Sequence, residues 1–402
     1  MTRRVNRVTL AQNMSSGIWQ HGSEIPRASG KLKPGLRVLM TVDAAGGVWD
    51  YSLQLSQALA PHGVEVVLAS MGSLPSPQQR ARLGKLDNVV LCESAYKLEW
   101  MNGAWRDVDA AGSWLLELES HVRPAIVHIN GYCHANLPWR VPSLVVGHSC
   151  VYSWYAAVRR ETPPAQWEEY RRRVAAGLHA ATLVTAPSEA MLAALELYYG
   201  RFNTVGAVYN GCAGMDYRPD TKQPMIFTAG RLWDEAKNIT MLDCLAAHVR
   251  WPIYAAGDRT SPEGKQTPLK NIILLGRLAK PELADWMNRA AIFALPARYE
   301  PFGLAALEAA LAGCVLILGD ISSLREIWRD AALFVPPNNP AALSDTLNRV
   351  ICDGDLRGLM SMRARKRAWF FSVERMTRGY VDLYRRVLSP AVEPPATLNF
   401  EP

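Results

Sequence analysis

The feature that most constrains the fold is an alternation of short apolar runs with helical stretches, which begins near residue 36 and restarts after residue 224. This rhythm is typical of parallel α/β sheets. A polar stretch with two prolines, 216–224, separates the two series and reads as a linker. At 402 residues, 49% of them apolar, the chain can bury two cores. The sequence therefore predicts an α/β fold with two doubly wound domains that face one cleft.

Each apolar run predicts a strand. In the first series the predicted strands are 36–42, 64–69, 88–92, 125–130, 144–148, 183–186 and 205–209. In the second series they are 225–229, 253–256, 271–275, 291–295 and 315–318. Ligands of such sheets bind beyond the carboxyl ends of the strands. Polar residues that directly follow these runs are therefore the candidates for a functional site.

We expect a polar, flexible extension over 1–35, an N-terminal domain over 36–217 and a C-terminal domain over 222–372. The extension lacks the apolar core of a secretion signal, and no apolar run approaches the roughly 20 residues that span a bilayer. The seven cysteines are scattered without a Cys-x-x-Cys pair, which argues for a reducing cytoplasm. The net charge of +7 is modest, and no nucleic-acid-binding module is recognisable.

Two carboxylates, Glu300 and Glu308, frame the start of a predicted helix. Phe302, Gly303 and Leu304 would open that helix, whose unpaired backbone N–H groups and dipole can hold a phosphate. Carboxylates on either side of a diphosphate suit hydrogen bonds to sugar hydroxyls. One glutamate would face a transferable sugar and the other a ribose. The segment predicts a sugar-nucleotide site.

Two loops after predicted strands carry further phosphate-binding candidates. Arg231 and Lys237 share one loop and can neutralise a diphosphate; a pair of surface charges is the alternative. Gly46 and Gly47 follow the first strand, where glycine lets backbone N–H groups approach a phosphate, although a plain turn explains them nearly as well. No loop matches Gly-x-Gly-x-x-Gly or the lysine-bearing phosphate loop, which argues against a nicotinamide cofactor and a nucleoside triphosphatase.

The strand ends of the first half supply candidates for sugar or acceptor contacts. His148 ends a strand and can hydrogen-bond a sugar hydroxyl, with a core histidine as the alternative. His128 and His134 flank Asn130, and both suit an acceptor pocket better than a metal site. Aromatic faces suit carbohydrates, although most such residues fill a core. We expect two or three of the nearby aromatic residues to reach an acceptor, from Trp49, Tyr51, Tyr132, Trp139, Trp154 and Tyr155.

Two Asp-x-Asp pairs, Asp107 with Asp109 and Asp353 with Asp355, have the form used by metal-dependent sugar transferases of another fold. Neither pair follows an apolar strand. Asp109 is predicted as a helix N-cap. We assign no metal and no cofactor.

One helical face allows two interpretations, packing against the protein core or contact with a membrane. It consists of Trp167, Tyr170, Val174 and Leu178, with three arginines at 171–173 beside it. A core-facing helix is the favoured interpretation, and a helix seated peripherally on the inner face of a membrane is the alternative.

Together these segments resemble the retaining GT-B glycosyltransferases of family GT4, from about residue 36 to 388. The most specific part is the Glu300-Pro-Phe-Gly-Leu to Glu308 stretch, which resembles that group's Glu-x7-Glu motif. The Gly-Arg-Leu loop from Gly230 to Lys237 is similar to its diphosphate loop. Softer matches are Gly46-Gly47, His148, Ser188-Glu189, Asn210-Gly211, Leu324-Arg325-Glu326 and the segment that begins at Asp330.

The resemblance implies an acceptor-binding N-terminal domain, a donor-binding C-terminal domain and a final helix, 373–388, that packs back on the first domain. It also implies that Arg231 and Lys237 hold the diphosphate with backbone groups of Gly47, Gly303 and Leu304. The remaining implied roles are a ribose contact for Glu308, a donor-sugar contact near O3 or O4 for Glu300, a sugar contact for His148, and a base-flanking loop at Gly276-Arg277-Leu278.

The activity that the resemblance implies is retaining, metal-independent transfer of a hexose from a nucleoside diphosphate sugar to a carbohydrate or glycolipid acceptor. Two other functions stay open at this point. One is a sugar-nucleotide 2-epimerase or phosphorylase on the same fold. The other is a non-catalytic sugar-binding subunit, against which the presence of Glu300, Glu308, Arg231 and Lys237 together argues. The base, sugar, acceptor, linkage, pathway and oligomeric state do not follow from the sequence.

Overall fold

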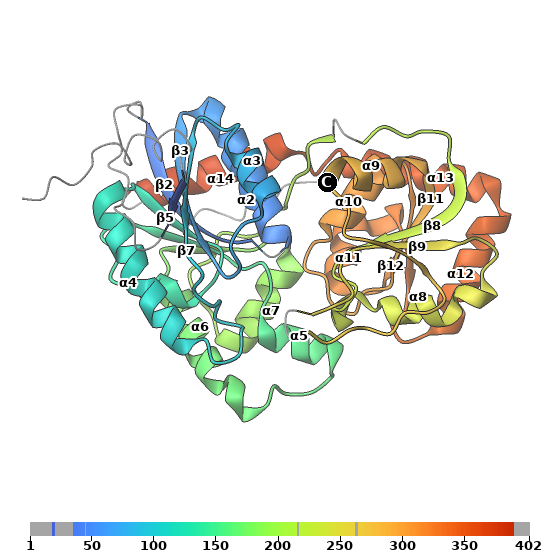
Figure 1. The fold of residues 1–402 in the computed structure, drawn as a ribbon, viewed down its shortest axis with the longest axis horizontal. Helices are drawn as coiled ribbons and strands as arrows, with labels where there is room; N and C mark the ends of the chain where they lie inside the picture. Colours follow the sequence, from blue (N-terminus) through green and yellow to red (C-terminus); the bar gives the residue numbers. More distant parts are fainter. Residues whose placement is uncertain (1–17, 21–34, 45, 215–216, 262–263, 390–402) are drawn as a thin grey trace, which may run out of the picture.

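The structure is a computed structural model that describes residues 18–20, 35–44, 46–214, 217–261 and 264–389. Two parallel sheets, each flanked by helices, form two halves that lie side by side (Figure 1). Every strand pair in the two sheets is parallel. The predicted α/β class with two doubly wound sheets is confirmed.

The N-terminal sheet has the strand order β1-β4-β3-β2-β5-β6-β7. Its strands are β1 (Ile18–Gln20), β2 (Leu36–Asp43), β3 (Val64–Met71), β4 (Val89–Glu93), β5 (Ile126–Ile129), β6 (Ser143–Val146) and β7 (Leu183–Thr185). Its helices are α2 (Gly47–Leu59), α3 (Pro77–Leu83), α4 (Trp105–Val122), α5 (Val151–Val158), α6 (Glu168–Ala180) and α7 (Glu189–Tyr199). The central strands are rich in valine, leucine and isoleucine because helices cover both of their faces.

The C-terminal sheet has the order β10-β9-β8-β11-β12-β13. Its strands are β8 (Gln223–Ala229), β9 (Ile253–Ala256), β10 (Ile273–Gly276), β11 (Ala290–Leu295), β12 (Val315–Gly319) and β13 (Leu333–Val335). Its helices are α8 (Ile239–Leu245), α9 (Lys280–Arg289), α10 (Leu304–Leu311), α11 (Ser322–Trp328), α12 (Pro340–Cys352) and α13 (Gly354–Ala368). The strand order reverses between the neighbours β8 and β11, where a doubly wound sheet binds its ligand.

The last helix, α14 (Val373–Leu388), returns to the N-terminal half, where it appears in red behind the sheet in Figure 1. Tyr380 and Tyr384 belong to the N-terminal core together with Tyr51 of α2. The buried imidazole of His128 joins these elements, since its Nδ1 lies 2.8 Å from the Tyr384 hydroxyl and its Nε2 3.3 Å from the Tyr51 hydroxyl. The chain therefore crosses between the halves twice.

Two expectations about the backbone are wrong. No strand forms over 205–209 in the described chain, because Gly206 adopts φ +81° and breaks the extended run; Val205 and Val208 still donate backbone N–H bonds to Val184 and Ala186. Asp109 is not an N-cap, since α4 begins at Trp105.

The ends of the predicted domains also differ in part from expectation. Within the 1–35 extension, residues 18–20 form an edge strand that pairs with β4, and the other residues up to 34 lie outside the described ranges. Of the predicted linker, residues 217–222 lack a helix or strand, and β8 begins at Gln223.

The core-facing interpretation of the 167–178 helix is confirmed. Tyr170, Val174 and Leu178 are buried in an N-terminal core cluster. The adjacent arginines form ion pairs with acidic residues, Arg171 with Glu168, Arg172 with Glu169, and Arg173 with Asp109 and Glu169. Among the described helices, none combines the length and the apolar character needed to cross a bilayer.

Acid should destabilise the fold through His128. Burial, with a smaller contribution from His148, lowers the pKa of His128 to about 3, whereas an unfolded chain protonates this residue near pH 6.5. The stabilisation is therefore complete above about pH 6.5 and is lost as the pH falls toward 3, at about 1.4 kcal/mol per pH unit. We expect the thermal midpoint of the wild type to fall more steeply between pH 7 and 5 than that of His128→Gln. Equal slopes would contradict this assignment.

Candidate functional site

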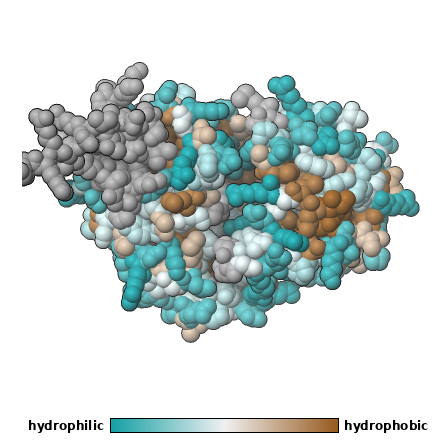
Figure 2. All heavy atoms as spheres, in the orientation of Figure 1, coloured by the Kyte–Doolittle hydropathy of each residue, from teal (hydrophilic) through white to brown (hydrophobic). Residues whose placement is uncertain are grey.

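The candidate site lies where the loops after β8 and β11 leave the switch point of the C-terminal sheet. These loops carry Arg231 and Lys237 on one side and Glu300 on the other. They face the N-terminal half, and on the face drawn in Figure 2 hydrophilic residues gather along the junction of the halves. Neighbouring strands thus bring together charged residues that the sequence places more than sixty positions apart.

Lys237 and Glu300 form an ion pair through Nζ and Oε2. Their side chains are only 16% and 13% exposed. Lys237 ends a 3₁₀ turn, and the next residue, Asn238, has a left-handed φ of 56° and donates through Nδ2 to the carbonyls of Pro296 (2.9 Å) and Pro337 (2.8 Å). The amide of Asn238 therefore fixes the turn that directs Lys237 toward Glu300.

Arg231 lies at the start of the same loop, and about half of its side chain is exposed. One guanidinium nitrogen, Nη2, donates to Asp234 Oδ2 at 2.8 Å, and the group lies over the ring of Trp233. The other oxygen of Asp234 accepts from Trp154 Nε1 of the N-terminal half at 3.3 Å. The remaining N–H groups of the fork are geometrically suited to an anion.

Two helices begin side by side at this junction. A Cβ atom on Gly47, the first residue of α2, would lie 3.8 Å from Leu304 Cδ1, at the first residue of α10. The preceding residues Gly46 (φ +136°) and Gly303 (φ +91°) adopt conformations that favour glycine. In the described chain, no side chain caps either helix. Two positive helix ends are therefore available to the same ligand.

Glu308 lies one turn further along α10 and is 5% exposed. Lys280 Nζ, at the start of α9, lies 2.7 Å from Glu308 Oε1 and 3.4 Å from Asp50 Oδ2 of α2. Burial lowers the pKa of Lys280, but the two carboxylates outweigh it and the pKa is raised. Arg82 Nη1 also lies 3.0 Å from Asp50 Oδ1. This cluster joins the two halves.

The residue before Glu300 is anchored in the N-terminal half. The Tyr299 hydroxyl lies 2.8 Å from Ser153 Oγ and accepts from the Cys150 backbone N–H at 3.2 Å. Cys150 is two residues from His148. The structure therefore holds the Glu300 loop against the segment that carries His148.

His148 is half-buried, and its Nε2 donates to Asn130 Oδ1 at 2.9 Å. Asn130 is held in turn, since its Nδ2 donates to the Thr41 carbonyl at 2.8 Å. Burial lowers the pKa of His148 to about 3, so the ring is neutral near pH 7 and Nδ1 is its acceptor nitrogen. His148 is thus suited to accept a hydrogen bond from a hydroxyl.

The other residues predicted to contact an acceptor are mostly buried. Tyr132 donates to the Ser149 carbonyl, and His134 Nε2 lies 3.0 Å from the Val108 carbonyl. Contact of these residues with an acceptor stays a prediction, and in this structure their side chains are part of the protein interior. The buried ones are Trp49, Tyr51, His128, Tyr132 and His134.

The loop predicted to flank the base begins at the last residue of β10. Gly276 has φ +68°, Leu278 is half-buried, and the exposed Arg277 Nη1 lies 3.9 Å from Asp258 Oδ2. Phe302 is buried with its ring against Phe371. Phe302 therefore offers a ligand its backbone and not its ring.

Sequence reasoning missed three residues of this junction, Asp50, Lys280 and Tyr299, and it matched Glu326 to the family without assigning it a role. Glu326 of α11 accepts from the backbone N–H groups of Glu189 and Ala190, both at 2.8 Å, and so caps α7 across the junction. One signal was available, because a lysine in the first turn of a helix opposes the helix dipole. Lys280 in α9 is such a residue.

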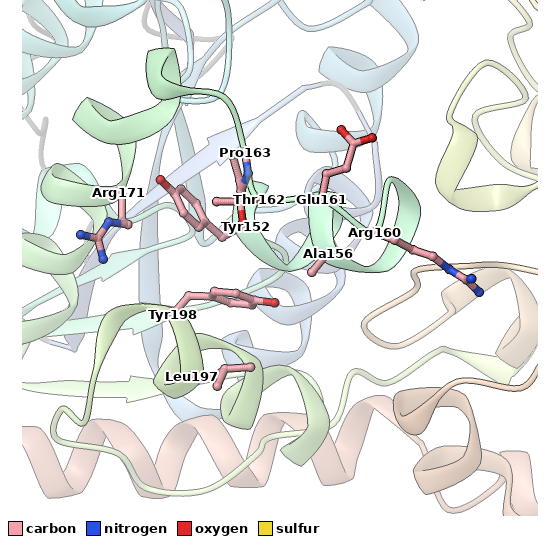
Figure 3. Close-up of a pocket in the computed structure, with 9 residues that line it drawn as sticks. All are labelled: Tyr152, Ala156, Arg160, Glu161, Thr162, Pro163, Arg171, Leu197 and Tyr198. Atoms are coloured by element: carbon pink, nitrogen blue, oxygen red, sulfur yellow. The ribbon is translucent and has the colours of Figure 1, made fainter.

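A separate surface pocket of about 600 Å³ lies in the N-terminal half, between the end of α5, the loop after it and the end of α7 (Figure 3). Tyr152 and Tyr198 lie toward its middle, whereas Arg160 and Arg171 point outward. None of the predicted site residues lines it. The lining residues are Tyr152, Ala156, Arg160, Glu161, Thr162, Pro163, Arg171, Leu197 and Tyr198.

Two family models match the chain, one for each half. Residues 45–212 match the model described as Glycosyltransferase Family 4, and residues 216–367 match the one described as Glycosyl transferases group 1. Together the two matches include the whole C-terminal sheet and strands β3 to β7 of the N-terminal sheet, whereas β1 and β2 precede the first match.

Curated relatives match shorter stretches. A D-inositol 3-phosphate glycosyltransferase of Frankia alni is 35% identical over 112 residues, which is 27% of this chain and 28% of the relative. An O-antigen chain mannosyltransferase B of Escherichia coli is 27% identical over 164 residues, 41% of this chain and 38% of the relative. The aligned stretches thus span less than two fifths of these relatives.

Solved structures match nearly the whole fold. Sucrose-phosphate synthase from Thermosynechococcus elongatus has a TM-score of 0.74 at 17% identity, with 89% of this chain and 100% of that chain covered. The Anabaena protein HepE in complex with UDP-glucose has a TM-score of 0.69 at 15% identity, with 87% of this chain and 100% of that chain covered. At such identities the likeness shows the fold.

Breaking the Lys237–Glu300 pair should destabilise the protein. Either Lys237→Met or Glu300→Gln leaves a mostly buried charge without its partner, at a cost of about 3 kcal/mol. The double variant should be more stable than the two single effects predict, as thermal or urea unfolding would measure. Asp285→Asn, which breaks the exposed Arg289–Asp285 pair, is the control and should cost less than about 1 kcal/mol. Additive single effects would contradict the pairing.

Proposed function

The chain belongs to the GT4-like glycosyltransferases, and on that premise we propose that it transfers a hexose from a nucleoside diphosphate sugar to a carbohydrate or glycolipid acceptor. The observation that carries the proposal is the Lys237–Glu300 pair beside the adjoining starts of α2 and α10. A ligand would satisfy both features if it joined an anionic group covalently to a group that bears hydroxyls. A sugar diphosphate is such a ligand.

The diphosphate would lie at the two helix starts. Backbone N–H groups at Gly47 and Leu304 and the guanidinium of Arg231 would bind its oxygens. Lys237 would exchange the Glu300 carboxylate for a phosphate oxygen. This exchange keeps the ammonium paired in both states, so binding does not leave a buried charge without a partner. With this charge compensation in place, we propose that no metal is required.

The two glutamates would then bind the two sugars. Glu300, released from Lys237, would accept hydrogen bonds from hydroxyls of the transferred hexose. Glu308 follows Leu304 by about 6 Å along the helix axis, a distance that suits the ribose beside a diphosphate. His148, held by Asn130, would contact the hexose from the other half through its acceptor nitrogen.

We propose a retaining reaction by front-face displacement. The acceptor hydroxyl oxygen bonds to the anomeric carbon as the bond from that carbon to the diphosphate oxygen breaks. The hydroxyl proton passes to the departing phosphate oxygen. Arg231, Lys237 and the helix ends stabilise the charge that develops on the leaving group, and the two halves orient the reactants and exclude water.

A donor screen tests this function. UDP-, GDP- and ADP-hexoses are incubated with glycan and lipid acceptors, with and without EDTA, while release of nucleoside diphosphate is followed. We expect one donor to release nucleoside diphosphate, and only when an acceptor is present. The rate of release should be the same with and without EDTA. NMR should show that the product keeps the donor's anomeric configuration. Donor conversion without acceptor indicates an epimerase, a phosphate requirement indicates a phosphorylase, and no reaction with any donor favours a binding subunit.

The variant Glu300→Gln should separate binding from turnover. Because it frees Lys237 for the phosphate, the affinity for the nucleoside diphosphate should stay equal or rise. Loss of the charged contact with the hexose should lower kcat by about 10²-fold. Glu168→Gln, which removes an exposed charge of α6, is the matched control and should leave both values unchanged. Full turnover together with weaker nucleotide binding would contradict the role of Glu300.

A further inference from the structure

Lys280 occupies a place that the proposed reaction does not yet use. Its ammonium lies between Glu308 of the C-terminal half and Asp50 of the N-terminal half, at 2.7 and 3.4 Å. Side chains of Lys280 and Glu308 are 35% and 6% exposed. The buried carboxylate thus has a cation on one of its two oxygens, Oε1.

The ionic bridge formed by Asp50, Lys280 and Glu308 lies beside the proposed phosphate site. Gly47 and Leu304, the first residues of α2 and α10, lie against one another. Asp50 and Glu308 follow them within about one turn on each helix. Lys280 therefore connects the two helices one turn behind the point where the diphosphate would bind.

We propose that Lys280 is a positioning residue for ribose recognition, and this inference rests on the proposed function. By holding Oε1 of Glu308, Lys280 directs Oε2 toward the ribose hydroxyls. By contacting Asp50 at the same time, it connects the ribose site to the N-terminal half. The Lys280–Glu308 contact thus serves recognition of the ribose, and the Lys280–Asp50 contact strengthens nucleotide binding by holding the two halves together.

The chemistry of the three groups supports the assignment. A carboxylate accepts several hydrogen bonds and so can serve a lysine and a hydroxyl at once. Lysine has three donors and can keep both carboxylates while the ribose binds. Within the described residues, the Lys280 ammonium is the side-chain group that donates a hydrogen bond to Glu308 Oε1. Without this ammonium, the buried carboxylate of Glu308 would have no fixed orientation.

The test compares nucleoside diphosphates with their 2′,3′-dideoxy counterparts. Calorimetry measures binding of UDP, GDP and ADP and of the dideoxy compounds to the wild type and to Lys280→Met. We expect the preferred nucleotide to bind the wild type at least about tenfold more tightly than its dideoxy form. Lys280→Met should bind the preferred nucleotide about tenfold more weakly and should lose most of the discrimination. Lys280→Arg should restore part of it.

Two further variants distinguish the Lys280–Asp50 contact from the Lys280–Glu308 contact. Asp50→Asn should weaken nucleotide binding but keep the discrimination, because the Lys280–Glu308 contact remains. Asp285→Asn, which removes an exposed charge from the same helix as Lys280, should change neither. Equal discrimination in Lys280→Met and wild type would overturn this inference alone. Failure of the wild type to bind any of the three nucleotides would instead overturn the proposed function, and this inference with it.

Discussion

The helices α2 and α10 begin side by side, and this arrangement governs the rest of the junction. Each helix start presents unpaired N–H groups and the positive end of a dipole. Two such ends in contact repel one another unless an anion lies near them. The left-handed glycines Gly46 and Gly303 let the chain turn into each helix at this point. The strand order of both sheets then places the charged loops around it.

The charges at the junction are neutralised in pairs. Lys237 pairs with Glu300, and Lys280 with Glu308. In a mostly buried setting an unpaired charge is costly, so a ligand can bind tightly only if it replaces one partner of a pair without leaving the other alone. A nucleoside diphosphate sugar offers anions and hydroxyls in the required order. The same pairs that stabilise the protein would therefore select the ligand.

Much of this arrangement can be predicted from the sequence, because buried parallel strands are continuous apolar runs and the site loops directly follow them. Glu300 and Lys237 were found in this way. The Lys280–Asp50 contact was not, since it joins residues 230 positions apart on helices of different halves, and no local pattern encodes such a contact. The strand expected over 205–209 failed because a single glycine interrupts it. The burial of Trp49 likewise depends on tertiary packing and not on its residue type.

The most direct test of the account is a crystal structure with the preferred nucleoside diphosphate hexose bound. The account predicts that Lys237 has left Glu300 for a phosphate oxygen, that Glu300 contacts hexose hydroxyls, and that Glu308 contacts the ribose. The diphosphate would lie against the first residues of α2 and α10. A donor bound elsewhere, or bound here with the Lys237–Glu300 pair intact, would contradict the central claim.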